Sequence, residues 1–305
     1  MRFREGTDDG EGLTFEVERG PSALRLEVSP SRRLRLVAGE RWLMWAELWS
    51  GHYGVTLVRS DDPRSPEILP PMRSADVRRV STREAWLRRL ARSLAESSRA
   101  PLRSGTWRLV ALKPDGAGRF APRSGEVGLA AVDLFDALTA PRAREDDFGA
   151  QGSWSVWPLR RPPEPDAPRV KAWRKHARDG TLPPVVLAAV SGLSTHLLVD
   201  GHDRLAAAHA EGVTPELFVL APVREVAPDE GARARVAEAY ARSFEAVPEA
   251  GRAALGEALV RAFSPLLVGA PSVASFRSGL DAEWEEEVRA VLGEPAFRAL
   301  FVDAT

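Results

Sequence analysis

The chain has 305 residues, a formal net charge of −1 and no cysteine. This length favours two domains over a single core, and the composition, with 44% hydrophobic and 28% charged residues, is typical of a globular protein. The lack of cysteine excludes disulfides, thiolate metal sites and cysteine nucleophiles. The balanced charge provides no global cationic field that would attract nucleic acid.

We expect neither a membrane helix nor a secretory signal in this chain. No stretch approaches the roughly 18 apolar residues that a membrane helix needs. The first residues have no apolar segment of the kind that follows the basic start of a secretory signal. We therefore expect a cytoplasmic protein that contacts no membrane and binds nucleic acid weakly at most.

Residues 1–150 are expected to form a β-rich N-terminal domain. Apolar residues alternate on both sides of a turn at 29–32, which predicts an antiparallel hairpin with one buried face, built from Leu24, Leu26, Val28, Leu34, Leu36 and Val37. Trp42, Trp45 and Trp49 then recur at intervals of three and four, which is helical spacing. We expect these tryptophans to belong to the core rather than to a ligand-binding surface, because each ring buries a large area.

The rest of this domain reads as one helix followed by short elements. Residues 81–97 predict an amphipathic helix with Ser81 as its cap and Glu84 completing a capping box; its buried face is Trp86, Leu87, Leu90 and Leu94. Residues 107–112 predict a strand, and 132–138 a short helix or strand. The pattern lapses over 140–153, which we expect to be a domain linker. Asp146 and Asp147 lie within it and are expected to be solvated rather than to bind a metal.

The most informative segment runs from 183 to 220. It predicts a strand at 184–190, a turn at Ser191-Gly192, a strand at 196–199, a helix from about His202 to Gly212, and a strand at 217–220. Where a strand leads through glycine into a helix, free N–H groups and the positive end of the helix dipole form an anion site. Gly201 is expected to let a phosphate approach the backbone, and Arg204 to offer its planar fork to phosphate oxygens.

Residues from about 154 to 222, less than a quarter of the chain, resemble the ParB/sulfiredoxin-like superfamily. The sequence from Val199 to Ala208, followed by Gly212, is similar to the DGHxR-type box of that superfamily. The parts upstream also come in the superfamily's order: Trp157-Pro158-Leu159, Glu164, an amphipathic helix with Val170, Trp173 and Ala177, Gly180, and Leu182-Pro183-Pro184 before the strand.

The resemblance implies a bacterial protein with an α/β domain that binds a nucleotide, either ATP, ADP or CTP. Sulfiredoxin activity is excluded because the chain has no cysteine. His202 and Asp203 replace the Glu and first Arg of the ParB box, so the free-serine-kinase type of box is more similar. By that resemblance, the nucleotide is held by Asp200, Gly201, His202, Asp203 and Arg204, and Glu164 and His202 are catalytic, with Glu164 as the base.

Each of these residues also has a purely structural interpretation. Asp200 is suited to an Asx-turn, and Glu164 to a solvated position in a Pro-rich loop. His202 is suited to a helix start with one satisfied nitrogen. The Asp203 carboxylate interacts favourably with the positive end of the helix dipole, but it repels a phosphate unless Mg²⁺ lies between the carboxylate and the phosphate oxygens. His196 and His209 are expected to be structural. The basic side of the 169–176 helix is expected to be a solvated face, with a position beside the phosphates as the alternative.

The region from 230 to 305 is expected to be helical. Apolar residues recur at helical spacing in three stripes: Val236, Tyr240 and Phe244; Leu255, Leu259 and Phe263; Trp284, Val288 and Val291. Such helices could pack on the preceding domain or form a homodimer surface.

The expected architecture is therefore α+β, with a β-rich domain (1–150), a ParB/sulfiredoxin-like α/β domain (154–225) and a C-terminal helical region (230–305). The expected function is binding of a nucleotide phosphate, with Mg²⁺-dependent phosphoryl transfer to a small molecule as its catalytic version. The alternative is a nucleotide-responsive regulatory or protein-binding module with a degenerate site.

Overall fold

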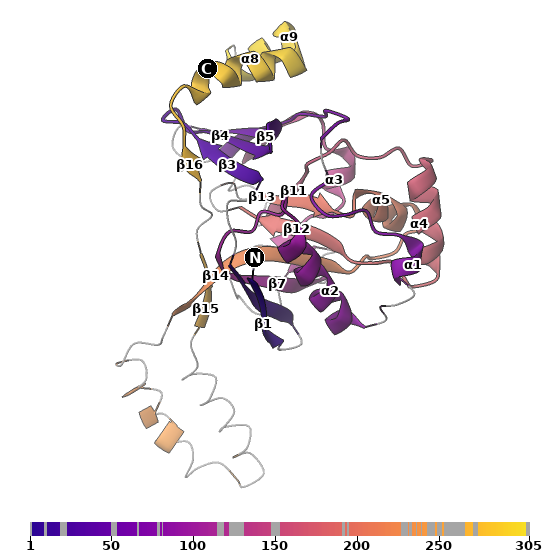
Figure 1. Cartoon of the computed structure of the whole chain (residues 1–305), viewed down its shortest axis with the longest axis vertical. Helices are drawn as coiled ribbons and strands as arrows, with labels where there is room; N and C mark the ends of the chain where they lie inside the picture. Colours follow the sequence, from indigo (N-terminus) through magenta and orange to yellow (C-terminus); the bar gives the residue numbers. More distant parts are fainter. Residues whose placement is uncertain are drawn as a thin grey trace.

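The structure is a computed structural model. It describes residues 2–8, 11–18, 23–49, 54–65, 67–77, 80, 82–114, 119–121, 131–147, 153–190, 193, 195–226, 266–270 and 274–302, together with single positions between 231 and 252. The chain combines two mixed sheets with helices, so the expected α+β class is confirmed (Figure 1). No helix in the described part of the chain is both long and apolar enough to span a membrane.

The first sheet has ten strands and contains the segment expected to carry the function. Its order is β1 (Arg2–Asp8), β2 (Gly12–Glu18), β7 (Gly105–Pro114), β8 (Phe120–Ala121), β9 (Ala131–Val132), β11 (Ser153–Pro158), β13 (Thr195–Asp200), β12 (Val185–Ala189), β14 (Leu217–Val226) and β15 (Leu266–Gly269). Strand β14 also pairs with β7, from Leu217↔Leu112 to Val223↔Thr106. The strands from β7 round to β14 therefore close into a ring of hydrogen-bonded neighbours.

The second sheet has six strands and contains the predicted hairpin. Its order is β10 (Ala143–Asp147), β6 (Gly54–Arg59), β5 (Arg41–Leu48), β4 (Arg33–Ala38), β3 (Leu24–Val28) and β16 (Ser275–Phe276). The hairpin of β3 and β4 is confirmed, with Leu26 opposite Leu36 and Val28 opposite Leu34. Val37 differs from the expectation: it pairs with Arg25, on the other face of the hairpin.

The helical interpretation of Trp42, Trp45 and Trp49 was wrong, because Trp42 and Trp45 lie in strand β5. The register of β5 against β4 shifts where Leu36 pairs with Met44 and Val37 with Trp42. This bulge inserts one extra residue, so that two tryptophans three positions apart face the same side of the sheet. Both contribute to the cluster beneath the C-terminal helices, so their expected core role is confirmed.

Helix α2 (Arg83–Glu96) covers one end of the first sheet and is capped one position later than predicted. Thr82, not Ser81, is the N-cap, and its Oγ1 accepts the N–H of Ala85 at 3.2 Å. The predicted buried face of this helix is confirmed. Downstream, 132–138 combines the end of β9 with a short helix, α3 (Asp136–Thr139).

Residues 140–153 are not the expected linker, because 143–147 form β10, which pairs with β6 over its whole length. The strand was missed because its sequence, AREDD, is polar; its side chains find ionic partners instead of a core. Arg144 and Ser155 both donate to the Asp146 carboxylate. The expected boundary at 150–154 also cuts through a sheet, because β7 on one side of it pairs with β14 on the other.

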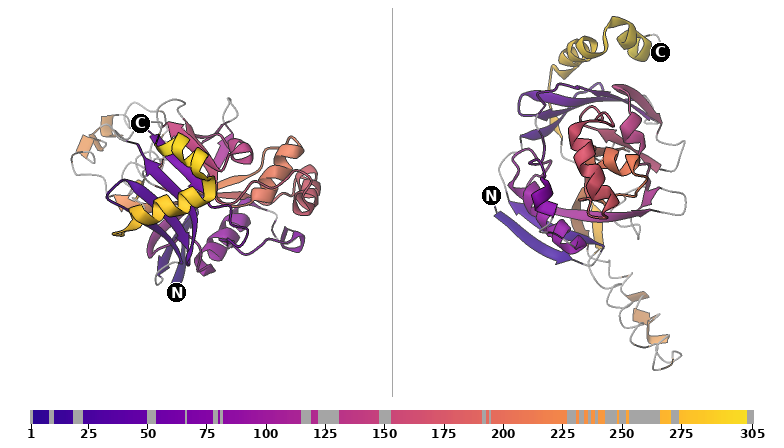
Figure 2. Two further views of the ribbon diagram at one scale, coloured as in Figure 1. Left: turned by 90° about the horizontal axis from the view of Figure 1, so that it is seen from above. Right: turned by 90° about the vertical axis from the view of Figure 1, so that its right-hand side faces the viewer.

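The C-terminal region is only partly helical in the described residues. Strands β15 and β16 fall inside it, and α8 (Leu280–Leu292) and α9 (Glu294–Phe301) follow. Trp284 and Val288 are buried as expected. Figure 2 shows α8 lying across the strands of the second sheet. The other two predicted stripes fall on 227–265, of which the structure describes only single positions, such as Tyr240.

Candidate anion site at the start of helix α5

The predicted strand–glycine–helix unit is present. Strand β13 ends at Asp200, and α5 (His202–Ala210) begins directly after Gly201. Helix α4 (Pro168–Arg178) packs beside α5, with its predicted buried residues Val170, Trp173 and Ala177 (Figure 1). The N–H groups of the first turn of α5 have no acceptor within the helix, and the positive end of its dipole lies here.

Gly201 serves the fold rather than the expected approach of a phosphate. Its φ of 99° is left-handed. A Cβ at this position would come within 3.1 Å of Arg204 Nη2 and 3.2 Å of Val185 Cα. The space beside the glycine is therefore already filled by protein atoms, and the backbone conformation and this packing together require glycine.

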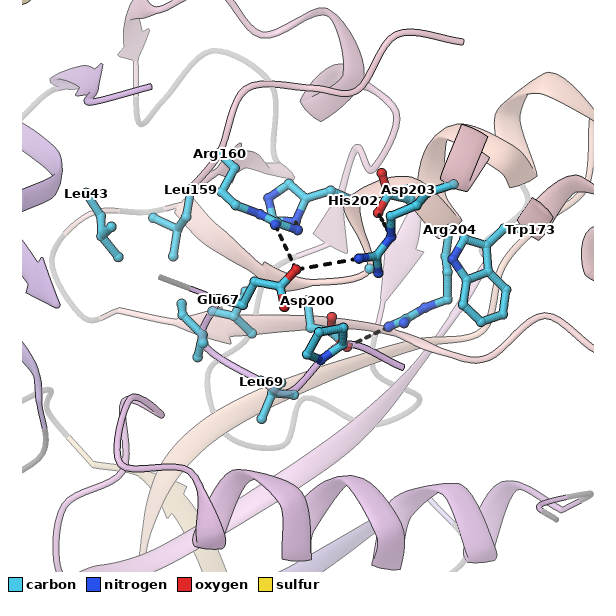
Figure 3. A pocket seen from close by; sticks show the side chains of 15 residues that line it. Leu43, Glu67, Leu69, Leu159, Arg160, Trp173, Asp200, His202, Asp203 and Arg204 are labelled. Carbon is cyan, nitrogen blue, oxygen red and sulfur yellow. Dashed lines mark hydrogen bonds and ion pairs between the residues drawn. The ribbon is translucent and has the colours of Figure 1, made fainter. Parts of the chain in front are cut away.

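The five residues of the box, from Asp200 to Arg204, line a common small cavity (Figure 3). Its volume is about 20 Å³. Glu67, Arg160 and Arg169 complete its charged lining, and Glu67 comes from a segment far from the other two in the sequence. Neither Glu67 nor Arg160 was predicted, and a single charged residue in an irregular segment carries no signal of its own in a sequence.

The charges around this cavity form a connected network. Glu67 Oε1 lies 3.3 Å from Arg160 Nη1 and 3.7 Å from Arg169 Nη1. Arg169 Nε lies 3.1 Å from the carboxylate of Asp203. With Asp200 paired to Arg204, three arginines meet three carboxylates, and the lining is formally neutral. Arg169, expected on a solvated face that could also neighbour the phosphates, is half exposed and pairs with Glu67 and Asp203.

Arg204 is used mainly by the protein itself. Its side chain is 3% exposed. Nη2 donates to Asp200 Oδ2 at 2.6 Å and to the carbonyl oxygen of Pro184 at 2.9 Å. Nη1 faces the sulfur of Met72 at 3.8 Å. The fork that was expected to bind phosphate thus holds β12, β13 and α5 together.

Arg204 Nε is a buried atom without a hydrogen-bond partner among the described residues, and so is one ring nitrogen of His202. His202 is 3% exposed, and the nitrogen without a partner in the described part of the chain is its Nε2. Burial, reinforced by the charges of Arg160, Arg59 and Arg204, holds the pKa of His202 well below its usual value of 6.5. The imidazole is therefore neutral near pH 7. With Nδ1 accepting from Arg160 at 3.5 Å, the proton lies on Nε2, which is a hydrogen-bond donor rather than a proton shuttle.

Glu164, the expected base, lies outside this cavity. It is exposed, pairs with Arg161 at 3.2 Å and lines a different cleft. The structure therefore brings Asp200 to Arg204 together but does not bring Glu164 to them. The solvated-loop interpretation of Glu164 agrees with this position.

The remaining histidines and acids fit structural roles. His196 is buried in β13, and burial lowers its pKa to about 3. His209 is exposed and packs against the ring of Phe135, with centroids 5.2 Å apart. Among the described residues, no group of three His, Asp or Glu side chains could hold a metal ion, and Asp203, the expected Mg²⁺ ligand, is paired with Arg169.

Comparison with known proteins adds no relative to this description. No protein-family model matches the chain, and no curated protein or solved structure matches it either. The resemblance of residues 154–222 to the ParB/sulfiredoxin-like superfamily therefore stays a prediction.

Proposed function

We propose that the protein binds the phosphate of a nucleotide (ATP, ADP or CTP) at the start of α5, as a nucleotide-responsive binding protein. The observation that carries this proposal is His202, a buried donor that lies at the positive end of a helix and has no partner among the residues the structure describes. A buried N–H with no acceptor costs roughly 1–3 kcal/mol. A phosphate oxygen would supply the acceptor, and Arg160 and Arg169 would supply charge.

The cavity fits a phosphate only after one rearrangement. A volume of about 20 Å³ accommodates about one water molecule. The carboxylate of Glu67 now lies between Arg160 and Arg169, where an anion would otherwise pair with them. Glu67 belongs to a segment without helix or strand, 67–73, so it can leave without breaking a backbone ladder. A phosphate that takes the place of the Glu67 carboxylate would pair with both Arg160 and Arg169, so neither arginine would lose an anionic partner.

The geometry favours binding over phosphoryl transfer. Transfer to an acceptor hydroxyl needs a base within hydrogen-bonding reach of that hydroxyl. Glu164 lines a separate cleft, and Asp203 is held by Arg169. The non-catalytic alternative from the sequence is therefore the one that the described contacts support better.

Three substitutions test the proposal, and two of them, Glu67→Gln and Glu164→Gln, make the same chemical change inside and outside the cavity. Isothermal titration with ATP, ADP and CTP, with and without Mg²⁺, would compare the wild type with Glu67→Gln, Arg169→Gln and Glu164→Gln. Removing the competing carboxylate in Glu67→Gln should tighten binding by roughly 5-fold, since a half-exposed ion pair contributes about 1 kcal/mol. Arg169→Gln should weaken it, and Glu164→Gln, the same chemical change outside the cavity, should leave it unaltered.

Two outcomes contradict this assignment. If Glu67→Gln binds no nucleotide in the millimolar range, the cavity is not a phosphate site. If the wild type transfers phosphate to an acceptor and Glu164→Gln loses that turnover while still binding nucleotide, then the catalytic version of the function is correct instead.

A further inference from the structure

A second and much larger cleft lies along the other end of α5. Its volume is about 580 Å³, within the range of roughly 300–1,000 Å³ that is typical of small-molecule sites. Its walls come from the end of β6, the corner between α3 and β10, the loop 161–165 and the last turns of α5. It shares no lining residue with the cavity at the start of α5.

A buried arginine with an unused donor lines this cleft. Arg59 is 2% exposed. Its Nε and Nη2 donate to the carboxylate of Asp61, and Nη2 also lies 3.5 Å from the carbonyl oxygen of Ala140. Its Nη1 has no partner among the described residues. A buried guanidinium with an unpaired N–H is costly, so this position calls for an acceptor.

The charges of the lining also favour an anion. Arg59, Arg142 and Arg161 face the cleft together with two carboxylates, Asp61 and Glu164, which leaves one positive charge in excess. Asp61 is shared between Arg59 and Arg142, whose Nε lies 3.1 Å from Oδ2. Arg161 and Glu164 are both exposed, so their pair exchanges readily with a ligand.

The backbone of Asp61 adds an independent sign of function. Its φ is 53°, one of two positive values among the described residues other than glycine. A non-glycine residue in this region is strained, and such residues cluster at ligand sites. The carboxylate of Asp61 lines the cleft and pairs with Arg59.

We propose that this cleft binds a small organic oxyanion, a carboxylate or a phosphate ester, with its charged group at Arg59 and its apolar body against the proline-rich wall. Arg161 reaches the ligand from the rim after releasing Glu164. Pro162, Pro163 and Leu138 provide the apolar surface. This site does not depend on the nucleotide site, because the two cavities are lined by different residues.

Four probes at constant ionic strength test this site on the full chain. Acetate and inorganic phosphate carry the charged group alone, whereas benzoate and phenyl phosphate add an apolar body. Binding should raise the thermal midpoint of the wild type by about 2 °C or more at 20 mM probe relative to chloride, with the larger rise for the aromatic member of each pair. If acetate and benzoate give the larger rise, the ligand's charged group is a carboxylate; if inorganic phosphate and phenyl phosphate do, it is a phosphate.

The variants assign the binding to this cleft. Ala210→Trp fills it from an exposed position at the end of α5, and Ala172→Trp is the matched control, an exposed alanine of α4 that lines neither this cleft nor the cavity at the start of α5. In an Arg169→Gln background, which weakens anion binding at the start of α5, the rise should persist with Ala172→Trp, fall with Arg161→Gln and disappear with Ala210→Trp. A rise that persists with Ala210→Trp in this background overturns the proposal. So does a rise that is lost in Arg169→Gln, which would place the anion in the nucleotide cavity, or no rise in the wild type.

Discussion

Arg204 Nη2 lies 2.6 Å from Asp200 Oδ2, so the first acidic residue of the predicted box neutralises its arginine. The same nitrogen donates to the carbonyl oxygen of Pro184, just before β12. The box is therefore a structural clasp between two strands and a helix, and its charged pair is not available as a ligand site. The residues that remain for a ligand are those around this clasp: His202, Arg160 and Arg169.

Arg204→Ala should destabilise the fold and not only a ligand complex. The substitution leaves the Asp200 carboxylate and the Pro184 carbonyl oxygen without their donor. Breaking a buried ion pair in this way lowers the free energy of unfolding by about 3–5 kcal/mol. Urea denaturation measures this loss, and Arg169→Ala, whose side chain is half exposed, should lose no more than about 1 kcal/mol. Unchanged stability with abolished nucleotide binding would show that Arg204 serves a ligand instead.

Gly201→Ala should cost more than the same change at Gly212. Both glycines have positive φ, 99° and 64°, so each alanine pays for its backbone conformation, about 1 kcal/mol. Only at Gly201 does the new Cβ also press on Val185 and Arg204, whereas at Gly212 nothing lies within 4 Å. The expected difference in unfolding free energy is about 1–3 kcal/mol. Equal losses in the two variants would refute the packing role of Gly201.

Stability should fall as the pH drops from 7.5 to 5.5, because the folded state keeps His196 neutral. Its folded pKa is about 3, whereas the unfolded chain takes up the proton near 6.5. Between these values the unfolded state binds more protons, so this stabilisation is complete above pH 6.5 and is lost below it. The loss from His196 alone is about 1.4 kcal/mol at pH 5.5. His202, whose pKa is also lowered, acts in the same direction.

The contribution of His196 to the pH dependence of stability can be measured by denaturing His196→Leu and the wild type between pH 5.5 and 7.5. The slope of the unfolding free energy against pH reports how many protons the chain takes up on unfolding. In His196→Leu this uptake should be smaller by nearly one proton, so the slope should be shallower than in the wild type. His209→Leu, at an exposed histidine, is the control and should keep the wild-type slope. A slope that His196→Leu does not change would mean that His196 is protonated in the folded protein.

Trp284→Ala should release α8 and α9 from the second sheet. The ring is buried, lies 3.6 Å from the Arg33 guanidinium and contacts Phe297 and Phe301. Loss of the ring removes the centre of this cluster and should lower the free energy of unfolding by about 3–5 kcal/mol. Trypsin should then cut faster after Arg289, while Phe276→Ala, at a residue that is 68% exposed, should leave the rate unchanged. An unchanged rate in Trp284→Ala would mean that the ion pairs of α8 hold the helices alone.

The sequence predicted best where neighbours in the chain are neighbours in space. The order β12, β13, α5, β14 follows from local alternation and from glycines at 201 and 212, and all of it was found. Trp42 and Trp45 were misread because a single bulge residue gives a strand the spacing of a helix. Strand β10 has no apolar alternation to reveal it, because its polar side chains pair with each other, as Arg144 does with Asp146, and with Ser155 of β11.

The same limit applies to the candidate site. The box residues were found because they are contiguous, but Glu67 and Arg160 reach them only through the tertiary fold. Glu164 was placed at the site by its position in a series of motifs, and the loop that carries it turns toward the other cleft. A sequence specifies which chemical groups are present more readily than which cavity each one faces.

The pairing of β7 with β14 has a consequence for synthesis of the chain. Residues 106–112 emerge from the ribosome long before 217–223, the strand that they must pair with. Until then β7 has β2 beside residues 105–110 and the short β8 beside 113–114, and the backbone N–H and C=O groups that will pair with β14 stay open in the nascent chain. Non-local pairing of this kind slows folding, so the first 150 residues are expected to need protection from aggregation rather than to fold as they are made.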